Sequence, residues 1–370
     1  MITRYSNYDL SSRNTFRMKV RCALYVEVSA EEDLLSLDWD ALPQPVMVMG
    51  GGSNLLFTKD FPGTVLHVAI GGITQIAGEA GNDGLPCPGG TPLSYPAATG
   101  YLRVTCGAGV VFDDFCAWAA SEGLWGPENL SLIPGECGAS AVQNIGAYGV
   151  EVKDILADIR AYDREKGRFV QIDPATCGYG YRSSKFKTGW KGRYIITAVT
   201  YRLSRTPQPR LDYGGVRKAL ERSEVEFAGT GTFPLAPADI REAIIGIRRQ
   251  KLPDPEEIGS AGSFFCNPVV SREHFQRIVA IARADNGPDY EVPHYEVGDQ
   301  VKVPAAWMID QCGFKGAVNG GAQVYPGQPL VIVNASGSAS PQEIVCLERQ
   351  IVQTIERKYG ITLHPEVEHV

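Results

Sequence analysis

The part of the sequence most able to bind an anion is a short run between two apolar stretches, Gly50, Gly51, Gly52, Ser53 and Asn54. Glycine loses much backbone entropy on folding and fills no core, so packing alone does not favour three in a row. A loop of this kind between two strands is typical of main-chain amides that approach a ligand such as a pyrophosphate. A plain tight turn is the alternative, because glycine-rich loops are common.

A second segment, residues 133–149, has small residues at nearly every other position. Such a loop lets the backbone approach a flat ligand closely, and its polar side chains can fix the orientation of that ligand. An irregular core loop is the alternative, but two long glycine-rich loops in one region favour a large nucleotide cofactor, most naturally a dinucleotide. The cofactor contacts that we expect here are Pro134, Gly135, Gly138, Ala139, Ser140, Gln143, Asn144, Gly146, Ala147 and Tyr148.

Other common nucleotide and metal sites do not match the sequence. Neither glycine-rich segment ends in the Lys-Ser/Thr pair of a P-loop, so a triphosphate would lack its cation and its magnesium ligand. The first run leads into apolar β-type residues, whereas the fingerprint GxGxxG opens a helix. The five histidines are isolated and have no metal-ligand spacing, so we expect no metal site.

Composition limits the class of protein. The chain has 370 residues, 44% of them hydrophobic, which is enough for two or three domains with large cores. No apolar run is long enough to cross a bilayer, and residues 1–16 lack the apolar segment of a signal peptide, which favours the cytoplasm. Nine cysteines without a CxxC pair indicate reduced core thiols. The formal charge of −7 argues against nucleic-acid and anionic-membrane partners, so we expect small-molecule partners. We also expect a monomer, although the charge does not bear on the oligomeric state.

The elements that must position these loops are mainly short strands up to about residue 203. Apolar residues recur on one face of 112–122, which predicts a helix that stops at Gly123. Residues 78–100 have little periodicity and predict an inserted surface loop. The predicted strands are residues 46–49, 65–70, 101–106, 155–162 and 169–172, the last two paired as a hairpin.

The last third of the chain is predicted to be helical and mixed. Apolar residues at helical spacing from Ile240 end before Pro253, which marks a boundary. Ser340 and Glu343 form a capping box ahead of a periodic apolar face, and Gly360 stops that helix. Residues 361–367 then predict a short terminal strand, which carries Glu366.

An ordered set of motifs spans nearly the whole chain and resembles the UDP-N-acetylenolpyruvoylglucosamine reductase family. Each motif is weak alone, but the ordered set is highly specific. Tyr213-Gly214 and the segment 251–255 further resemble the subgroup that keeps an additional tyrosine-bearing loop. The motifs are residues 14–16, 50–57, 133–135, 143–149, 180–186, 262–265 and 365–367.

The resemblance implies an α+β protein with a vanillyl-alcohol-oxidase (PCMH-type) FAD-binding fold and a separate α/β substrate-binding domain. The implied domains are an FAD-binding subdomain at 1–70, a second subdomain at 71–251, the substrate-binding domain at 252–360 and a C-terminal strand at 361–370 that returns to the active site. The FAD-binding region itself is expected at about 17–206.

The implied activity is that of an NADP-dependent UDP-N-acetylmuramate dehydrogenase with non-covalent FAD. NADPH reduces the flavin, and flavin N5 gives hydride to the vinyl carbon of UDP-N-acetylglucosamine enolpyruvate, which builds an enolate that needs cations, hydrogen bonds and a proton. By resemblance, Arg182 binds the substrate carboxylate, Glu366 acts as an acid that polarises it, and Ser263 donates the proton.

The resemblance also implies substrate contacts, and the sequence departs from the subgroup at two places. By resemblance, Tyr213, Lys251 and Asn267 meet the UDP diphosphate and its neighbours, with Tyr213 closing over the site. Glu368 stands where the subgroup has a basic residue, and the 78–100 insertion is longer than expected. A flavoprotein oxidase or dehydrogenase with another substrate, and a non-catalytic FAD-binding protein, are the alternative functions.

Overall fold

The computed structural model describes residues 1–76, 100–213, 215–222 and 235–370, so all but the last residue of the predicted 78–100 loop lies outside the described residues. The chain forms two compact units. Unit 1 consists of Met1–Tyr8, Cys22–Gly51 and Pro62–Arg249, and unit 2 of Asp9–Arg21, Gly52–Phe61 and Gln250–Val370. The division falls inside the first glycine run, after Gly51.

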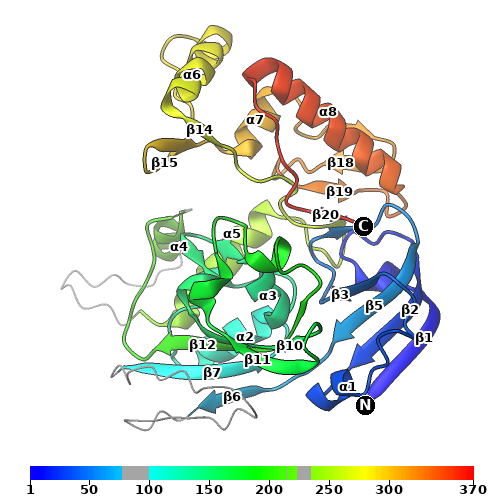
Figure 1. Cartoon of the computed structure of the whole chain (residues 1–370). Coiled ribbons are helices and arrows are strands. Elements are labelled where there is room, and N and C mark those ends of the chain that lie inside the picture. Colours follow the sequence, from blue (N-terminus) through cyan, green and yellow to red (C-terminus); the bar gives the residue numbers. More distant parts are fainter. Residues whose placement is uncertain (77–99, 214, 223–234) are drawn as a thin grey trace. The chain divides into compact units, whose positions relative to one another are not determined.

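The first sheet of unit 1 has four strands in the order β1–β2–β5–β3 (Figure 1). β3 pairs in parallel with β5, which places Met49 opposite His67 directly before the glycine run. β3 confirms the predicted strand at 46–49. The bounds in this part of the chain are β1 (Ile2–Asp9), β2 (Arg21–Val28), α1 (Glu31–Leu35), β3 (Val46–Met49) and β5 (Phe61–Val68).

The second sheet of unit 1 has five strands in the order β11–β10–β12–β7–β6, and all neighbours are antiparallel. The pairing of β10 with β11 confirms the predicted hairpin, and β7 confirms the predicted strand at 101–106. The strands are β6 (Ile73–Ile76), β7 (Tyr101–Gly107), β10 (Leu156–Asp163), β11 (Arg168–Ile172) and β12 (Tyr194–Ser204).

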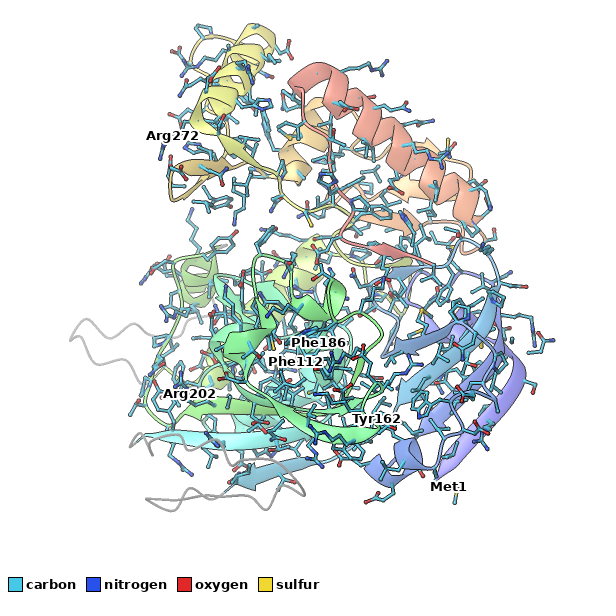
Figure 2. All side chains as sticks on the ribbon, viewed as in Figure 1. Met1, Phe112, Tyr162, Phe186, Arg202 and Arg272 are labelled. Carbon is cyan, nitrogen blue, oxygen red and sulfur yellow. The ribbon has the colours of Figure 1, made fainter. Side chains whose placement is uncertain are left out.

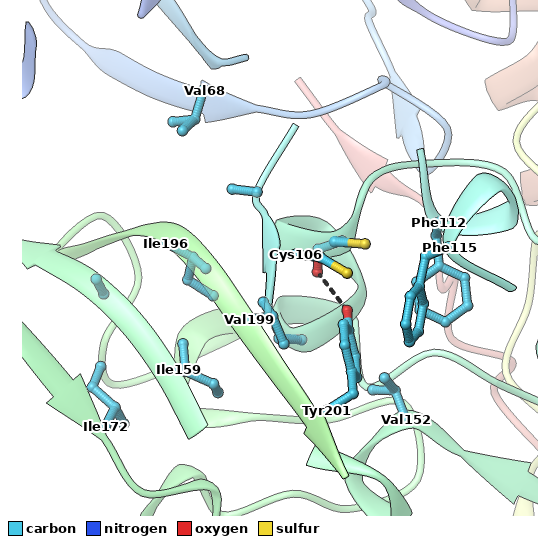
Figure 3. Packing of buried hydrophobic residues seen from close by; sticks show 14 of the residues in the cluster. Val68, Cys106, Phe112, Phe115, Val152, Ile159, Ile172, Ile196, Val199 and Tyr201 are labelled. Atoms are coloured by element: carbon cyan, nitrogen blue, oxygen red, sulfur yellow. Dashed lines mark hydrogen bonds between the residues drawn. The ribbon is translucent and has the colours of Figure 1, made fainter. Parts of the chain in front are cut away.

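Two helices pack against this sheet and form the main core of unit 1. α2 (Phe112–Ser121) confirms the predicted helix, and its Phe115 ring stacks on Tyr201 of β12 with the centroids 4.4 Å apart (Figure 3). α3 (Cys137–Gln143) lies against the same strand. Phe112 and Phe186 are both buried in this unit and lie among its green and cyan elements (Figure 2).

A smaller core in unit 1 holds α4 and α5, with Ile240, Ile244 and Ile247 packed together. The end of α5 at Lys251 confirms the predicted stop before Pro253. The remaining elements of unit 1 are β8 (Gly146–Ala147), β9 (Val150–Glu151), α4 (Val216–Arg222), α5 (Pro237–Lys251) and the 3₁₀ turns Glu128–Leu130, Val152–Asp154, Pro174–Cys177 and Lys185–Lys187.

Unit 2 contains a four-stranded sheet β13–β19–β18–β17, a three-stranded sheet β14–β16–β15 and the parallel pair β20–β4. The strands are β4 (Leu55–Leu56), β13 (Gly259–Ser260), β14 (Val269–Ser271), β15 (Tyr295–Val297), β16 (Gln300–Lys302), β17 (Val318–Asn319), β18 (Ala322–Val324), β19 (Ile332–Asn334) and β20 (Glu368–His369). The helices are α6 (Arg272–Asn286), α7 (Ala305–Gln311) and α8 (Pro341–Tyr359), with a 3₁₀ turn at Ser11–Arg13.

The predicted capping box at the start of α8 is confirmed. The Ser340 hydroxyl accepts from the Glu343 amide at 3.3 Å, and the Glu343 carboxylate accepts from the Ser340 amide at 2.8 Å. Gly360 closes the helix in the left-handed conformation at φ 67°. These signals lie within a few residues of the helix ends, which is why sequence alone places this helix correctly.

Two sequence predictions about elements are wrong. Residues 133–149 are not one irregular loop, because Cys137–Gln143 form helix α3, whose small residues allow it to pack closely. Residues 361–367 do not form a strand, since only Pro365 makes a bridge, to Phe265. The terminal strand is β20, two residues beyond Glu366, and its partner β4 lies more than 300 positions earlier in the chain.

Candidate functional site

Gly50 and Gly51, the part of the first glycine run that belongs to unit 1, lie beside the second glycine-rich segment. A Cβ atom added at Gly50 would lie 3.0 Å from Glu136 Oε2 and 3.4 Å from the Ala139 Cβ, and one added at Gly51 would lie 3.5 Å from the Gly135 Cα. Gly51 is exposed, and among the described residues beyond its chain neighbours no other atom lies within 4 Å of such a Cβ. The protein itself therefore does not require glycine at position 51, which leaves its backbone open to a ligand.

Other glycines of the two segments have a packing reason. Gly52 has φ +63°, and an added Cβ would lie 2.1 Å from the carbonyl oxygen of Arg13 within unit 2. An added Cβ at Gly138 would lie 2.8 Å from the Ala108 Cβ, so glycine lets α3 approach that backbone. For these two positions, close protein packing accounts for the residue without a ligand.

Two residues expected at the cofactor form hydrogen bonds within the protein. Ser140 is buried, and its hydroxyl donates to the Cys137 carbonyl at 2.7 Å and shares a hydrogen bond with the Tyr201 hydroxyl at 3.0 Å. Asn144 is fully buried; its Nδ2 donates to Glu151 Oε2 and to the Gly180 carbonyl, and its Oδ1 accepts from the Lys153 amide. These polar atoms therefore have a packing role in the protein, and their contact with a cofactor stays a prediction.

The other expected cofactor residues are at least partly accessible. Gln143 ends α3, and Gly146 and Ala147 form β8, which pairs with β9. The accessible set is Ser53, Asn54, Pro134, Gly135, Ala139, Gln143, Gly146, Ala147 and Tyr148.

Arg182 lies in unit 1 at a tight turn closed by hydrogen bonds between Gly180 and Ser183 at 3.0 and 3.1 Å. Its backbone is left-handed, with φ 54°, a conformation that costs a non-glycine residue about 1–3 kcal/mol. Its Nη2 donates to the Gly146 carbonyl at 2.7 Å, and its guanidinium lies 5.7 Å from the Tyr181 ring centroid. The strained turn therefore holds a cation against the end of the second glycine-rich segment.

Strained backbone concentrates in these segments. Leu132, Asn144, Tyr148 and Arg182 all have positive φ although none is glycine. Such residues cluster at functional sites, where neighbouring structure enforces the conformation. The residue types give no sign of these positive φ angles, so the sequence did not predict them.

A second arginine near Arg182 was also missed. Arg248 of α5 is half-buried, its buried Nε has no hydrogen-bond partner among the described residues, and desolvation lowers the pKa of its guanidinium. Tyr148 hydrogen-bonds to Arg248, while the charge of Arg182 disfavours a second cation there. Two guanidinium groups and a phenol thus face one region of unit 1, which is an arrangement suited to an anion.

Unit 2 brings Ser263 close to Glu366. The Glu366 amide donates to the Phe264 carbonyl at 2.8 Å, and the Cys266 amide donates to the His364 carbonyl at 3.0 Å. Asn54 forms a third hydrogen bond, in which its Nδ2 donates to the Glu366 carbonyl at 3.1 Å. The half-buried side chains of Ser263 and Glu366 therefore lie on neighbouring segments, which these hydrogen bonds hold together.

The residues expected to contact substrate lie in both units. Tyr213 is exposed in unit 1, and an added Cβ at Gly149 would lie 3.3 Å from the Tyr213 Cβ. Lys251 is exposed at the end of α5, and Asn267 Oδ1 accepts from the Ala305 amide at the start of α7 at 2.9 Å. Glu368 begins β20, and its amide donates to the Asn54 carbonyl at 3.0 Å.

Searches for two other kinds of site found none in the described parts of the chain. No three His, Cys, Asp or Glu side chains gather there as a metal site would require. None of the helices in those parts has both the length and the hydropathy of a bilayer span. The described cysteines are all free, and most are buried, as the sequence predicts.

The sequence matches two family models and several curated proteins. A model described as FAD binding domain matches residues 23–173, and one described as UDP-N-acetylenolpyruvoylglucosamine reductase, C-terminal domain, matches residues 254–370. The reductase of that name from Bacteroides fragilis strain YCH46 is 42% identical over 367 residues, covering 98% of this chain and 99% of its own length. The one from Chromobacterium violaceum is 40% identical over 365 residues, with 98% and 97% covered.

One solved structure supports the fold. The crystal structure of UDP-N-acetylenolpyruvylglucosamine reductase from Thermus caldophilus has a TM-score of 0.61 at 21% identity, covering 100% of this chain and 98% of that one. Together with the FAD-binding match, it confirms the predicted α+β class, with a vanillyl-alcohol-oxidase-type FAD-binding fold and a separate α/β domain.

Proposed function

Since the chain belongs to the UDP-N-acetylenolpyruvoylglucosamine reductase family, we propose that it reduces UDP-N-acetyl-3-O-(1-carboxyvinyl)-glucosamine to UDP-N-acetylmuramate, a peptidoglycan precursor. FAD is the bound cofactor and NADPH the electron donor of this proposal, and the protein acts as a cytoplasmic monomer. The observation that carries it is the 42% identity maintained over 98% of the chain.

The residues around the glycine run fit FAD. Gly51 is exposed, the described residues leave room for a Cβ there, and the Gly135 backbone lies beside it. Such a pair of backbones offers amides to a pyrophosphate without a side chain in the way. Gly50, Gly51 and Gly135 would hold that group, while the accessible residues from Gln143 to Tyr148 would border the rest of the cofactor.

Arg182 is the cation of the proposed mechanism. When bound, the reduced flavin supplies hydride to the vinyl carbon, and electron density then moves towards the substrate carboxylate. A guanidinium keeps its charge at all working pH values and presents a planar fork that matches a carboxylate. The turn at 180–183 presents this group, and its contact with the Gly146 carbonyl limits its motion.

Ser263 and Glu366 act on the same intermediate in this proposal. Ser263 gives its hydroxyl proton to the carbon next to the carboxylate, and Glu366 acts as an acid that polarises the carboxylate. Their positions on neighbouring segments of unit 2 support a shared task. The boundaries 252–360 for a substrate-binding domain, and Tyr213, Lys251 and Asn267 as contacts of the UDP diphosphate, complete the proposal.

Flavin content and NADPH oxidation test the function. Purified protein is expected to be yellow and to release FAD on denaturation, and NADPH oxidation is expected to require the enolpyruvyl nucleotide for sustained turnover. Colourless protein that takes up no added FAD would contradict the proposal. Equal turnover with and without the nucleotide would favour an oxidase of the same fold, and failure of NADPH to reduce the flavin would favour a non-catalytic FAD-binding protein.

A further inference from the structure

His67 lies between two carboxylates directly behind the glycine run of unit 1. It belongs to β5 and is buried; its Nδ1 is 3.0 Å from Glu27 Oε2, and its Nε2 is 2.9 Å from Glu136 Oε1. An ionised carboxylate only accepts hydrogen bonds, and a neutral imidazole has one N–H. Both contacts are satisfied together when the ring is an imidazolium that donates from both nitrogens.

The second oxygen of Glu136 faces the proposed pyrophosphate site. Glu136 follows Gly135 and precedes α3, and its Oε2 lies 3.0 Å from the position that a Cβ on Gly50 would occupy. A carboxylate beside an anion-binding loop repels the anion unless a cation compensates for it. With His67 charged, the three groups carry a net charge of −1; with His67 neutral, they carry −2.

We propose that His67 is a positioning residue for FAD, whose imidazolium holds Glu136 against β5 and compensates for its charge at Gly50 and Gly51. The inference rests on the proposed binding of FAD at this loop. It predicts that the protein binds the flavin tightly while His67 is protonated and more weakly once the ring is neutral, because Glu136 is then an uncompensated neighbour of the pyrophosphate.

The surroundings of the ring set the pH range of this effect. The titratable groups that face it are Glu27 and Tyr25 from β2 and Glu136 from the segment before α3. Burial lowers the pKa of His67, but hydrogen bonds and charge from Glu136 and Glu27 outweigh it and raise that pKa above the ordinary 6.5. A raised pKa means that the contact stabilises the protein fully below pH 6.5 and is lost as the pH rises through the raised value.

FAD affinity measured against pH tests the inference without catalysis. Flavin-free full-length protein is titrated with FAD between pH 6 and 9, with quenching of flavin fluorescence as the signal. The dissociation constant of the unchanged protein is expected to rise about tenfold across that range. Glu136→Gln is expected to bind tightly at every pH, and His67→Gln weakly at every pH.

A double variant separates charge compensation from simple loss of folding. His67→Gln together with Glu136→Gln is expected to regain the tight, pH-independent binding of Glu136→Gln, since no carboxylate remains to be compensated. His274→Gln is the matched control, because His274 bonds to the Tyr359 carbonyl at 2.7 Å, and it is expected to keep the normal pH profile. Thermal unfolding of each flavin-free variant checks that it is folded.

The possible outcomes distinguish failure of the inference about His67 from failure of the proposed FAD binding. A dissociation constant that is flat across pH in the unchanged protein, or a Glu136→Gln protein that keeps the pH dependence, overturns the inference and leaves FAD binding intact. A double variant as weak as His67→Gln also overturns it. Failure to bind FAD at any pH contradicts the proposed function itself.

Discussion

The two units hold their candidate catalytic groups by different means. In unit 1, Arg182 has a left-handed backbone, donates to the Gly146 carbonyl and lies over the ring of the neighbouring Tyr181. In unit 2, neither Ser263 nor Glu366 has a positive φ, and main-chain hydrogen bonds together with one from the Asn54 side chain hold their segments side by side. A fixed charge in a partly buried place needs special support, whereas a hydroxyl and a carboxylate need only the correct register between two segments.

Ser263→Ala is expected to have the largest effect, because it removes the proton donor and leaves the main-chain register unchanged. Reduction of the enolpyruvyl substrate by the preformed reduced flavin is expected to slow about 10²–10⁴-fold, the range for a positioned acid. Stopped-flow absorbance of the flavin measures this step, while FAD content and flavin reduction by NADPH are expected to stay normal.

Two further serine variants sharpen that result. Ser263→Cys is expected to retain part of the rate, because a thiol can also donate a proton. Ser338→Ala, at an exposed serine whose hydroxyl shares a hydrogen bond only with that of Ser336, is the matched control and is expected to be unchanged. A normal rate in Ser263→Ala would remove Ser263 from the mechanism.

Two substitutions of Arg182 separate the effect of its left-handed backbone on stability from the effect of its charge on the reaction rate. Both Arg182→Ala and Arg182→Gly are expected to slow the same flavin oxidation step about 10²–10³-fold, as for loss of a group that stabilises developing charge. Arg182→Gly is expected to be more stable than Arg182→Ala by about 1 kcal/mol, because glycine adopts φ 54° without strain. Equal denaturant midpoints of the two variants would contradict the strain at this turn.

The sequence predicted local structure well and the cofactor segment less well. The ends of α8 follow from Ser340, Glu343 and Gly360, all of which act within a few residues. Helix α3 was missed because its glycine and alanine residues are typical of a loop near a ligand, and its stability comes from packing on β12 and Ala108. Strand β20 was misplaced because its partner β4 is distant in sequence.

The same limit applies to the candidate site. The family motifs pointed to Arg182, Ser263 and Glu366, but sequence gives no sign that His67 lies between Glu27 and Glu136, or that Arg248 bonds to Tyr148. These contacts join residues far apart in the chain, and each residue type is ordinary alone. A histidine inside an apolar strand is the one signal that could have been followed.

Gly51 and Gly52 are neighbours in one motif but belong to different units, so we expect their substitutions to have different effects. Gly51→Val is expected to weaken FAD binding about tenfold or more, a change of about 1.4 kcal/mol, because a side chain enters the proposed pyrophosphate site. Gly52→Ala is expected to lower the stability of the flavin-free protein by about 1–3 kcal/mol, since its Cβ would meet the Arg13 carbonyl at positive φ. Fluorescence titration and denaturant unfolding measure the two effects.

Ser140→Ala gives the smallest expected change and tests whether that residue packs the core or contacts the cofactor. Its hydroxyl bonds to Cys137 and Tyr201 inside the core, so its loss is expected to lower the free energy of unfolding by about 1 kcal/mol. FAD affinity is expected to stay the same, because the buried hydroxyl bonds to the Cys137 carbonyl and to Tyr201 of β12. Weaker flavin binding with unchanged stability would return Ser140 to the cofactor site and would mean that α3 contributes side chains, and not only a closely packed backbone, to the flavin.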